Sequence, residues 1–207
     1  MARIRGGIGT TFSGKAGGMI FSEWKGIQVM RAAFERSKNS WSEKQVLHRR
    51  RFKAINEYCA KYKYTLIPQI WNLAAENGHG YNLFLKANSP AFALDGQLAE
   101  IEKLHFSAGK LPLPRQFEAK RKDSDPSKVE ATWVNDENLS QVYAHDELIM
   151  VCAYADHFTN LAITGAQRLN GQALIDLPAD YQNTMGIWLF FRAYKKDGYS
   201  LDQYFGL

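Results

Sequence analysis

The stretch VEATW (residues 129–133) alternates apolar with polar side chains, and the stretch from Leu148 to Tyr154 is almost continuously apolar. Alternation with a period of two is typical of a strand with one face on a core and the other in water. The apolar run is typical of a further strand. These two stretches therefore predict that the C-terminal half of the chain is built from β-strands.

More strands and turn signals surround these two stretches. Apolar segments follow at residues 161–164, 173–177 and 187–194, and the strongest hairpin signals are Asn170-Gly171 and Asp197-Gly198. Short strands at this spacing over about 100 residues predict an antiparallel immunoglobulin-like or fibronectin-like β-sandwich. We expect Trp133 or Trp188 in its core.

The N-terminal half has a different pattern. Residues 6–31 are rich in glycine and carry apolar residues around Lys25-Gly26, which predicts a β-hairpin. Ser40 precedes Glu43 by three residues, the spacing of a capping box, and predicts the start of a helix. The apolar stripe expected on that helix consists of His48, Phe52, Ile55, Cys59 and Tyr62.

These patterns together predict an α+β fold in two domains. Residues 1–110 would form a basic domain of a glycine-rich hairpin plus α-helices, and residues 111–207 the β-sandwich. A chain of 207 residues that is 45% hydrophobic and 23% charged is typical of a globular protein rather than a disordered one. The first residues contain no signal-peptide h-region, and no run reaches the roughly 20 apolar residues of a membrane span, so we expect a soluble, cytoplasmic protein.

The charge of the chain is unevenly distributed. Residues 1–63 hold 14 basic and 4 acidic side chains, a net charge of +10, whereas residues 64–207 hold 12 and 17, a net charge of −5. An imbalance of this kind suggests a polyanion, an acidic partner or an acidic neighbouring subunit for the N-terminal third. It does not choose among them.

The candidate residues for such a contact lie in the expected helix and just after it. They are Lys44, Arg49, Arg50, Lys53 and Lys61. These side chains could contact phosphates, but the cluster matches no groove-reading motif and no RNA-binding signature. We therefore favour a solvated or protein-contacting helix face over nucleic acid.

No pattern in the chain predicts catalysis, a metal or a cofactor. The segment from Gly9 to Ala16 has the glycine and lysine spacing of a phosphate loop, but Ala16 replaces the hydroxyl that holds magnesium. His145, Asp146 and Glu147 are separated from Asp156 and His157 by an apolar strand, so we expect solvated strand ends rather than a metal site. Cys59 and Cys152 are interpreted as buried core residues rather than as a disulfide.

Two segments resemble the ends of an uncharacterised bacterial family. The opening one has Phe12-Ser13-Gly14-Lys15-Ala16-Gly17, then Trp24-Lys25-Gly26 and Val29-Met30-Arg31, and the closing one has Asp197-Gly198-Tyr199-Ser200 and Tyr204-Phe205-Gly206. The resemblance extends over the length of the chain. The family is a domain of unknown function, so the resemblance implies no activity, and it favours a structural role for the N-terminal glycines.

We therefore expect a non-enzymatic structural or protein-interaction protein, as part of a larger or phage-like assembly. A nucleic-acid-binding protein that uses its basic N-terminal third is the first alternative. An enzyme with an unrecognised site is the second. No membrane contact is expected.

Overall fold

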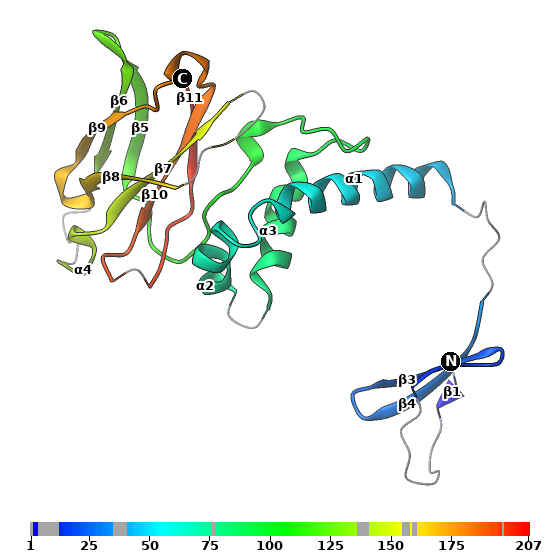
Figure 1. Cartoon of the computed structure of the whole chain (residues 1–207). Helices are drawn as coiled ribbons and strands as arrows, with labels where there is room; N and C mark the ends of the chain where they lie inside the picture. Colours follow the sequence, from blue (N-terminus) through cyan, green and yellow to red (C-terminus); the bar gives the residue numbers. More distant parts are fainter. Residues whose placement is uncertain are drawn as a thin grey trace. The chain divides into compact units, whose positions relative to one another are not determined.

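The computed structural model describes residues 2–3, 13–34, 41–75, 78–135, 141–154, 158, 161–195 and 197–207. The chain divides into two compact units, Met1–Glu43 and Lys44–Leu207. The first unit holds a small β-sheet, and the second holds helices and two further sheets (Figure 1). All pairs between these strands are antiparallel, and the combination of such sheets with helices confirms the predicted α+β class.

The first unit is a four-stranded sheet with the order β1-β4-β3-β2. Its strands are β1 (Ala2–Arg3), β2 (Gly14–Ala16), β3 (Met19–Trp24) and β4 (Ile27–Ala32). Lys25 and Gly26 connect β3 to β4 with φ values of 50° and 75°. Positive φ at both central residues is what a two-residue type I′ turn requires. The hairpin predicted at this dipeptide is confirmed.

The helices come next along the chain. They are α1 (Glu43–Ala60), the π-helical turn η1 (Ile67–Trp71), α2 (Asn72–Ala74), α3 (Gly80–Asn88) and the 3-10 turns η2 (Ser89–Ala91) and η3 (Ile101–Lys103). None of the helices within the described part of the chain is long and apolar enough to cross a membrane.

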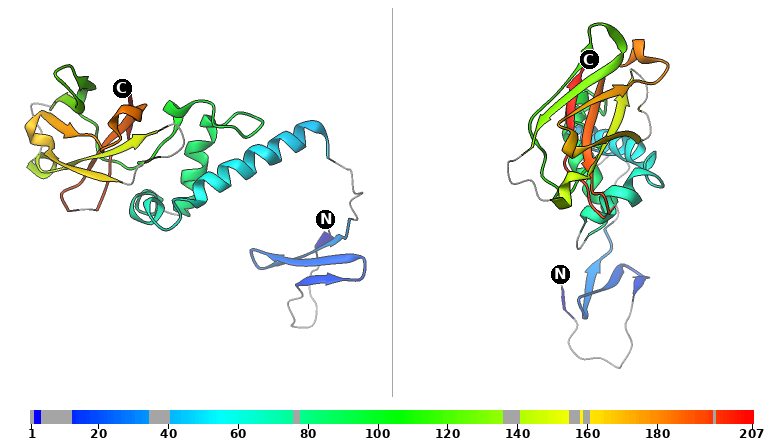
Figure 2. Two further views of the ribbon diagram at one scale, coloured as in Figure 1. Left: turned by 45° about the horizontal axis from the view of Figure 1, so that its top comes forward. Right: turned by 90° about the vertical axis from the view of Figure 1, so that its left-hand side faces the viewer.

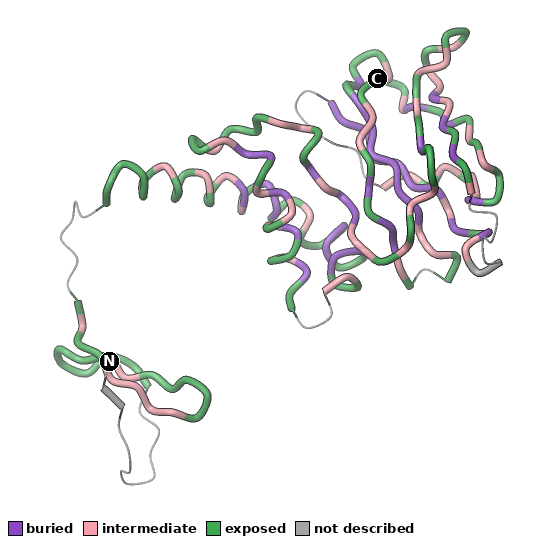
Figure 3. Tube along the Cα trace, turned by 180° about the vertical axis from the view of Figure 1, so that it is seen from behind, coloured by how far each residue is buried: buried purple, intermediate pink, exposed green. Residues whose placement is uncertain are grey.

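Helix α1 differs from its predicted start and stripe. It begins at Glu43, so Ser42 precedes the first helical residue, and the predicted cap Ser40 lies outside the described residues. Its buried residues are Ile55, Tyr58 and Cys59, whereas His48 and Phe52 are exposed. The stripe is therefore wrong in its first half, because the core lies only against the second half of the helix (Figure 3).

Two antiparallel sheets form the rest of the second unit. The three-stranded sheet has the order β5-β6-β9, and the four-stranded sheet has the order β11-β10-β7-β8. The elements are β5 (Arg115–Lys122), β6 (Asp125–Val134), α4 (Gln141–Ala144), β7 (Glu147–Ala153), β8 (Ala162–Gln167), η4 (Arg168–Asn170), β9 (Gln172–Asp176), η5 (Tyr181–Asn183), β10 (Gly186–Arg192) and β11 (Gln203–Gly206).

The four-stranded sheet is the middle of three layers (Figure 2). Ile149 and Val151 of β7 pack in a core with α1, η1 and α3, while Leu148 and Met150 pack in a second core with β5, β6 and β9. Burial on both faces explains why β7 is apolar without alternation. In β6, Val129 and Trp133 are buried and face the second core, as their alternation predicts.

The first core crosses the boundary predicted between residues 110 and 111. It joins helical residues such as Trp71 and Phe84 to β-sheet residues such as Trp188 and Phe190. The compact units instead divide the chain after Glu43. Independent folding of residues 111–207 stays a prediction, and the shared core provides the argument against it.

The two predicted turns have different outcomes. Asp197-Gly198 lies in the connection between the antiparallel neighbours β10 and β11, as a hairpin requires. Asn170-Gly171 connects β8 to β9, which belong to different sheets, so the hairpin predicted there is wrong. Gly171 has a φ of 68°, and the local turn chemistry is the same whether the next strand pairs with the last one or enters the other sheet.

The two cysteines are free and buried, as predicted. Cys59 lies in the first core and Cys152 in the second. Burial raises the pKa of the Cys59 thiol to about 12. This thiol is therefore protonated and unreactive at neutral pH.

Candidate partner-binding surfaces

The five basic candidates are all exposed on or beside α1. At about 100° per residue, Arg49, Arg50 and Lys53 lie on the side of α1 opposite to its buried residues. Lys44 lies on the same side as the buried residues but precedes them by three turns, and Lys61 follows the end of the helix. The structure therefore brings three of the five candidates together on one helix face, which we call the basic face.

Two charged residues of α1, Glu57 and Arg51, lie next to the basic face. Lys53 Nζ lies 3.7 Å from Glu57 Oε1, one helical turn away. Because the two side chains are 78% and 67% exposed, solvent screens the pair. Arg51 is directed away from this face. Its guanidinium donates a 2.7 Å hydrogen bond to the Ser89 carbonyl oxygen. Arg51 therefore ties α1 to the helical layer, whereas the basic face remains open to solvent.

The first three turns of α1 contain no buried residue. Each described position from Glu43 to Ala54 is exposed or half-buried, although Val46 and Phe52 are apolar (Figure 3). A helix of this length is marginal by itself in water, so it depends on the packed second half for its stability. The exposed half therefore presents charge and apolar area without contributing to the core.

The N-terminal sheet has no buried residue within the described range 13–34. Residues that pair across antiparallel strands share a face, so Met19, Phe21 and Met30 lie on one face of the sheet. Ile20 and Trp24 lie on the other face, where Ile20 pairs with the cationic residues Lys15 of β2 and Arg31 of β4. Large apolar side chains are therefore found on both faces.

The resemblance of residues 9–16 to a phosphate loop does not extend to its structure. Lys15 lies in β2, and Gly17-Gly18 turns the chain into β3. A phosphate loop connects a strand to a helix. The segment from Gly9 to Phe12 lies outside the described residues.

The acidic and histidine residues at the start of β7 are individually paired. His145 Nδ1 lies 3.2 Å from Gln167 Oε1, and Glu147 forms an ion pair with Arg192. Asp146 is buried and lies 3.3 Å from the guanidinium of Arg168, so it is a core residue rather than a solvated strand end. Burial raises the pKa of Asp146, and the charge of Arg168 opposes this shift. Asp156 and His157 lie outside the described residues. Within the described part of the chain, no three His, Cys, Asp or Glu side chains are grouped so that they could hold a metal ion.

A polar cluster that we did not predict joins the helical layer to the C-terminal segment. The buried carboxylate of Asp202 accepts hydrogen bonds from His105 Nδ1 at 2.9 Å, from the Phe106 amide at 2.5 Å and from the Ser107 amide at 3.2 Å. The hydrogen bond to Asp202 raises the pKa of His105. Because 97 positions separate the two residues, no local sequence signal could reveal the pair.

The Asp202 cluster is a structural clamp. Ser107 Oγ donates a 2.7 Å hydrogen bond to the Ser200 carbonyl oxygen and is buried. The hydroxyl is therefore bonded to the backbone and shielded from solvent, which makes it unavailable as a nucleophile. Asn88 is also fully buried and exchanges hydrogen bonds with the backbone of His105. The cluster holds residues 105–107 against the segment before β11.

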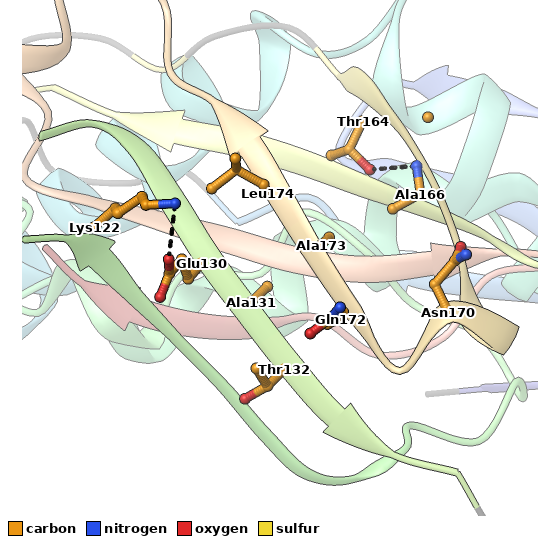
Figure 4. A pocket seen from close by; sticks show the side chains of 11 residues that line it. Lys122, Glu130, Ala131, Thr132, Thr164, Ala166, Asn170, Gln172, Ala173 and Leu174 are labelled. Atoms are coloured by element: carbon orange, nitrogen blue, oxygen red, sulfur yellow. Dashed lines mark hydrogen bonds and ion pairs between the residues drawn. The ribbon is translucent and has the colours of Figure 1, made fainter. Parts of the chain in front are cut away.

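Open grooves lie between described residues of the second unit, and we consider three of them. Two of them, of about 590 and 660 Å³, share Ala74, Leu83 and Lys110 beside α2 and α3. Gly109 is required there, since a Cβ atom at this position would lie 1.9 Å from the Tyr199 carbonyl oxygen. The third groove, of about 670 Å³, lies between β8 and β9 (Figure 4).

The fold and these surfaces define an α+β protein with a helical layer on a two-sheet sandwich and a coreless N-terminal sheet. The chain belongs to a family of unknown function, DUF6266, whose family model matches residues 11–205. The predicted resemblance to an uncharacterised family is thereby confirmed. No curated protein and no solved structure matches the chain.

Proposed function

We propose that this protein is a non-enzymatic interaction protein that binds a protein partner through its N-terminal sheet, as a component of a larger, phage-like assembly in the cytoplasm. One observation carries the proposal: residues 13–34 contain large apolar side chains on both faces of a sheet, and none of these described residues is buried. A small sheet needs a packed face for stability, and exposed apolar area of this kind is typical of an interaction surface.

The second unit would then be the stable body that carries this binding element. Its seven strands divide into sheets of three and four, in the manner of immunoglobulin-like and fibronectin-like sandwiches. Lettered A to G in chain order, β5 to β11 give the sheets A-B-E and G-F-C-D. This division supports the finer proposal of an immunoglobulin-like sandwich, in which the fourth strand lies beside the third.

Site-specific photo-crosslinking in the native cell tests the proposal. A benzophenone side chain placed at Trp24 should give a crosslinked protein adduct, because Trp24 is 62% exposed on the apolar sheet. The same group at Tyr194, which is 63% exposed on the second unit, is the matched control. Equal crosslinking at both positions, or none at Trp24, would contradict a docking role for the sheet.

Nucleic-acid binding is the second candidate function. The observation in its favour is the basic face, where Arg49, Arg50 and Lys53 are exposed together on one side of α1. Binding of this kind should be steeply salt-dependent and nearly independent of nucleic-acid sequence. If the protein is not retained on DNA, RNA or heparin columns near ~50 mM salt, nucleic-acid binding is excluded and the basic face is left for a protein contact.

A further inference from the structure

Strand β9 has an open edge. The Leu177 amide bonds to the Ser127 carbonyl, and the Trp133 amide bonds to the Gly171 carbonyl, which fixes the phase of the β6–β9 ladder. Backbone groups alternate in direction along an antiparallel strand, so Gln172, Leu174 and Asp176 direct their N–H and C=O groups away from β6. No backbone partner for these groups occurs among the described residues.

Strand β8, on the far side of the groove, cannot supply that partner. Its pairing with β7 is interrupted by a bulge between Ile163 and Gln167, where Gly165 has a φ of 78°. Thr164 Oγ1 donates to the Leu148 carbonyl at 2.9 Å and accepts from the Ala166 amide at 3.2 Å. A bulge of this kind bends an edge strand and ends its regular pairing. The regular free edge beside the groove is therefore that of β9.

The groove between the two strands is lined in part by small residues and has no net charge. Ala131, Gly165, Ala166 and Ala173 line it, and the alanine side chains leave room next to the second core (Figure 4). The charged side chains that line it, Lys122 and Glu130, lie 3.3 Å apart and neutralise each other. Its volume of about 670 Å³ thus combines unpaired strand backbone with electrically neutral walls.

We propose that this groove binds an extended, uncharged peptide segment of a partner protein by strand addition to β9. An incoming strand would pair with the outward backbone groups of Gln172, Leu174 and Asp176 and complete the three-stranded sheet with a fourth strand. Its alternate apolar side chains would lie over the alanine-lined wall, and the others would face solvent. Charge complementarity excludes a strongly acidic or basic segment, since the groove has no net charge. This proposal is independent of the N-terminal sheet.

Titration of the full-length protein with a capped heptapeptide of alternating threonine and valine, TVTVTVT, tests the inference. We expect saturable binding with a Kd below about 1 mM. The matched peptide TVTPPVT should bind at least about tenfold more weakly, because its two adjacent prolines remove one N–H donor on each side of the strand. Amide hydrogen exchange should show new protection at Gln172, Leu174 and Asp176. Ala173 and Ile175 already bond to β6 and should change little.

The substitution Leu174→Pro removes the outward N–H donor of β9 without removing a bond to β6. Proline is tolerated at an outward position of an edge strand, so the fold should persist. This variant should bind TVTVTVT at least about tenfold more weakly, whereas the control Leu174→Thr, which keeps the donor, should bind like the wild type. The exchange measurement on the wild-type protein tests the same contact if Leu174→Pro unfolds.

Three results would overturn the inference. The first is no binding of TVTVTVT at about 1 mM, and the second is binding without protection at the outward amides of β9. The third is dimerisation of the peptide-free protein that Leu174→Pro abolishes, because a second copy of the chain would then occupy the groove. None of these results bears on crosslinking at Trp24.

Discussion

The central sheet and the N-terminal sheet have similar strands but opposite surroundings. In β10 every residue from Gly186 to Phe191 is buried, because a layer packs on each face of the sheet. In β3 and β4 no residue is buried, although both strands carry several large apolar side chains. Apolar strand composition therefore does not by itself create a core. The neighbouring layers decide whether that composition stabilises the chain or remains available to a partner.

The largest effect should come from removing one of those layers. A fragment of residues 111–207 would expose Ile149, Val151, Trp188 and Phe190, which pack against the helices. Each would lose roughly 1.5–3 kcal/mol of burial, which together approaches the total stability of a typical domain. We expect this fragment to aggregate, and residues 44–207 to melt cooperatively like the full chain.

Circular dichroism and light scattering of the two fragments measure this difference. A folded, monomeric fragment of residues 111–207 would instead support the domain boundary predicted at residue 110. It would also show that the helical layer contributes little to the sandwich.

Two tryptophans provide a matched pair for the next prediction. Trp188 is 1% exposed and donates a 2.9 Å hydrogen bond from Nε1 to the Leu104 carbonyl, whereas Trp24 is 62% exposed. Trp188→Ala should lower the free energy of unfolding by about 3–5 kcal/mol through the cavity it leaves. Trp24→Ala should change it by less than about 0.5 kcal/mol. Urea denaturation followed by circular dichroism measures both, and similar losses would contradict the contrast between the sheets.

The Asp202 clamp joins the layers of the second unit, and its removal should have an intermediate effect. Asp202→Ala would leave the amides of Phe106 and Ser107 without their acceptor. Loss of a buried acceptor costs about 1–3 kcal/mol per donor left unpaired. Asp125→Ala, which removes a surface carboxylate bonded to Ser127, is a suitable control. An unchanged melting temperature for Asp202→Ala would show that the clamp adds nothing to the packed core.

The same clamp should make stability depend on pH. The hydrogen bond to Asp202 raises the pKa of His105 above its unfolded value of about 6.5, so the folded state holds this proton more tightly. The contribution is present in full below that unfolded pKa and is lost as the pH rises through the folded pKa.

A comparison with His105→Gln isolates this contribution. The melting temperature of the wild type should exceed that of the variant by more at pH 5 than at pH 9. The difference should be small, because the His105 side chain is 46% exposed and solvent screens it. A difference in melting temperature that widens toward pH 9 would contradict a stabilising interaction between protonated His105 and Asp202.

The smallest effect on stability is expected from the basic face. Replacing Arg49, Arg50 and Lys53 with Gln should change the free energy of unfolding by less than about 0.5 kcal/mol, because all three side chains are exposed. If the protein binds DNA or heparin, the same triple variant should reduce the log–log salt slope by roughly two or three units. Unfolding of the variant would show that these residues are structural.

Local features could be predicted from the sequence. The alternation in VEATW placed Val129 and Trp133 on the buried face of β6, and Lys25-Gly26 marked a type I′ turn. Both features depend on residues that are adjacent in the chain, where steric preferences and strand geometry act directly. The exposed position of Arg49, Arg50 and Lys53 followed from helix periodicity in the same way.

Features that depend on distant contacts could not be predicted. The stripe through His48 and Phe52 has a correct helical period, yet both residues are exposed because the buried core lies against the second half of α1. Asn170-Gly171 has the chemistry of a hairpin, yet the following strand enters the other sheet. Asp202 and His105 meet across 97 positions.

By itself, the sequence indicated the β3–β4 hairpin, the strands β6 to β10 and the main helix, because these follow from side-chain periodicity and local backbone preferences. Only the tertiary structure decided which apolar faces are covered, how the layers share their cores, and which strand edge stays open at β9. The physical reason is that burial and strand pairing are properties of neighbours in space, and the chain brings those neighbours together only when it folds.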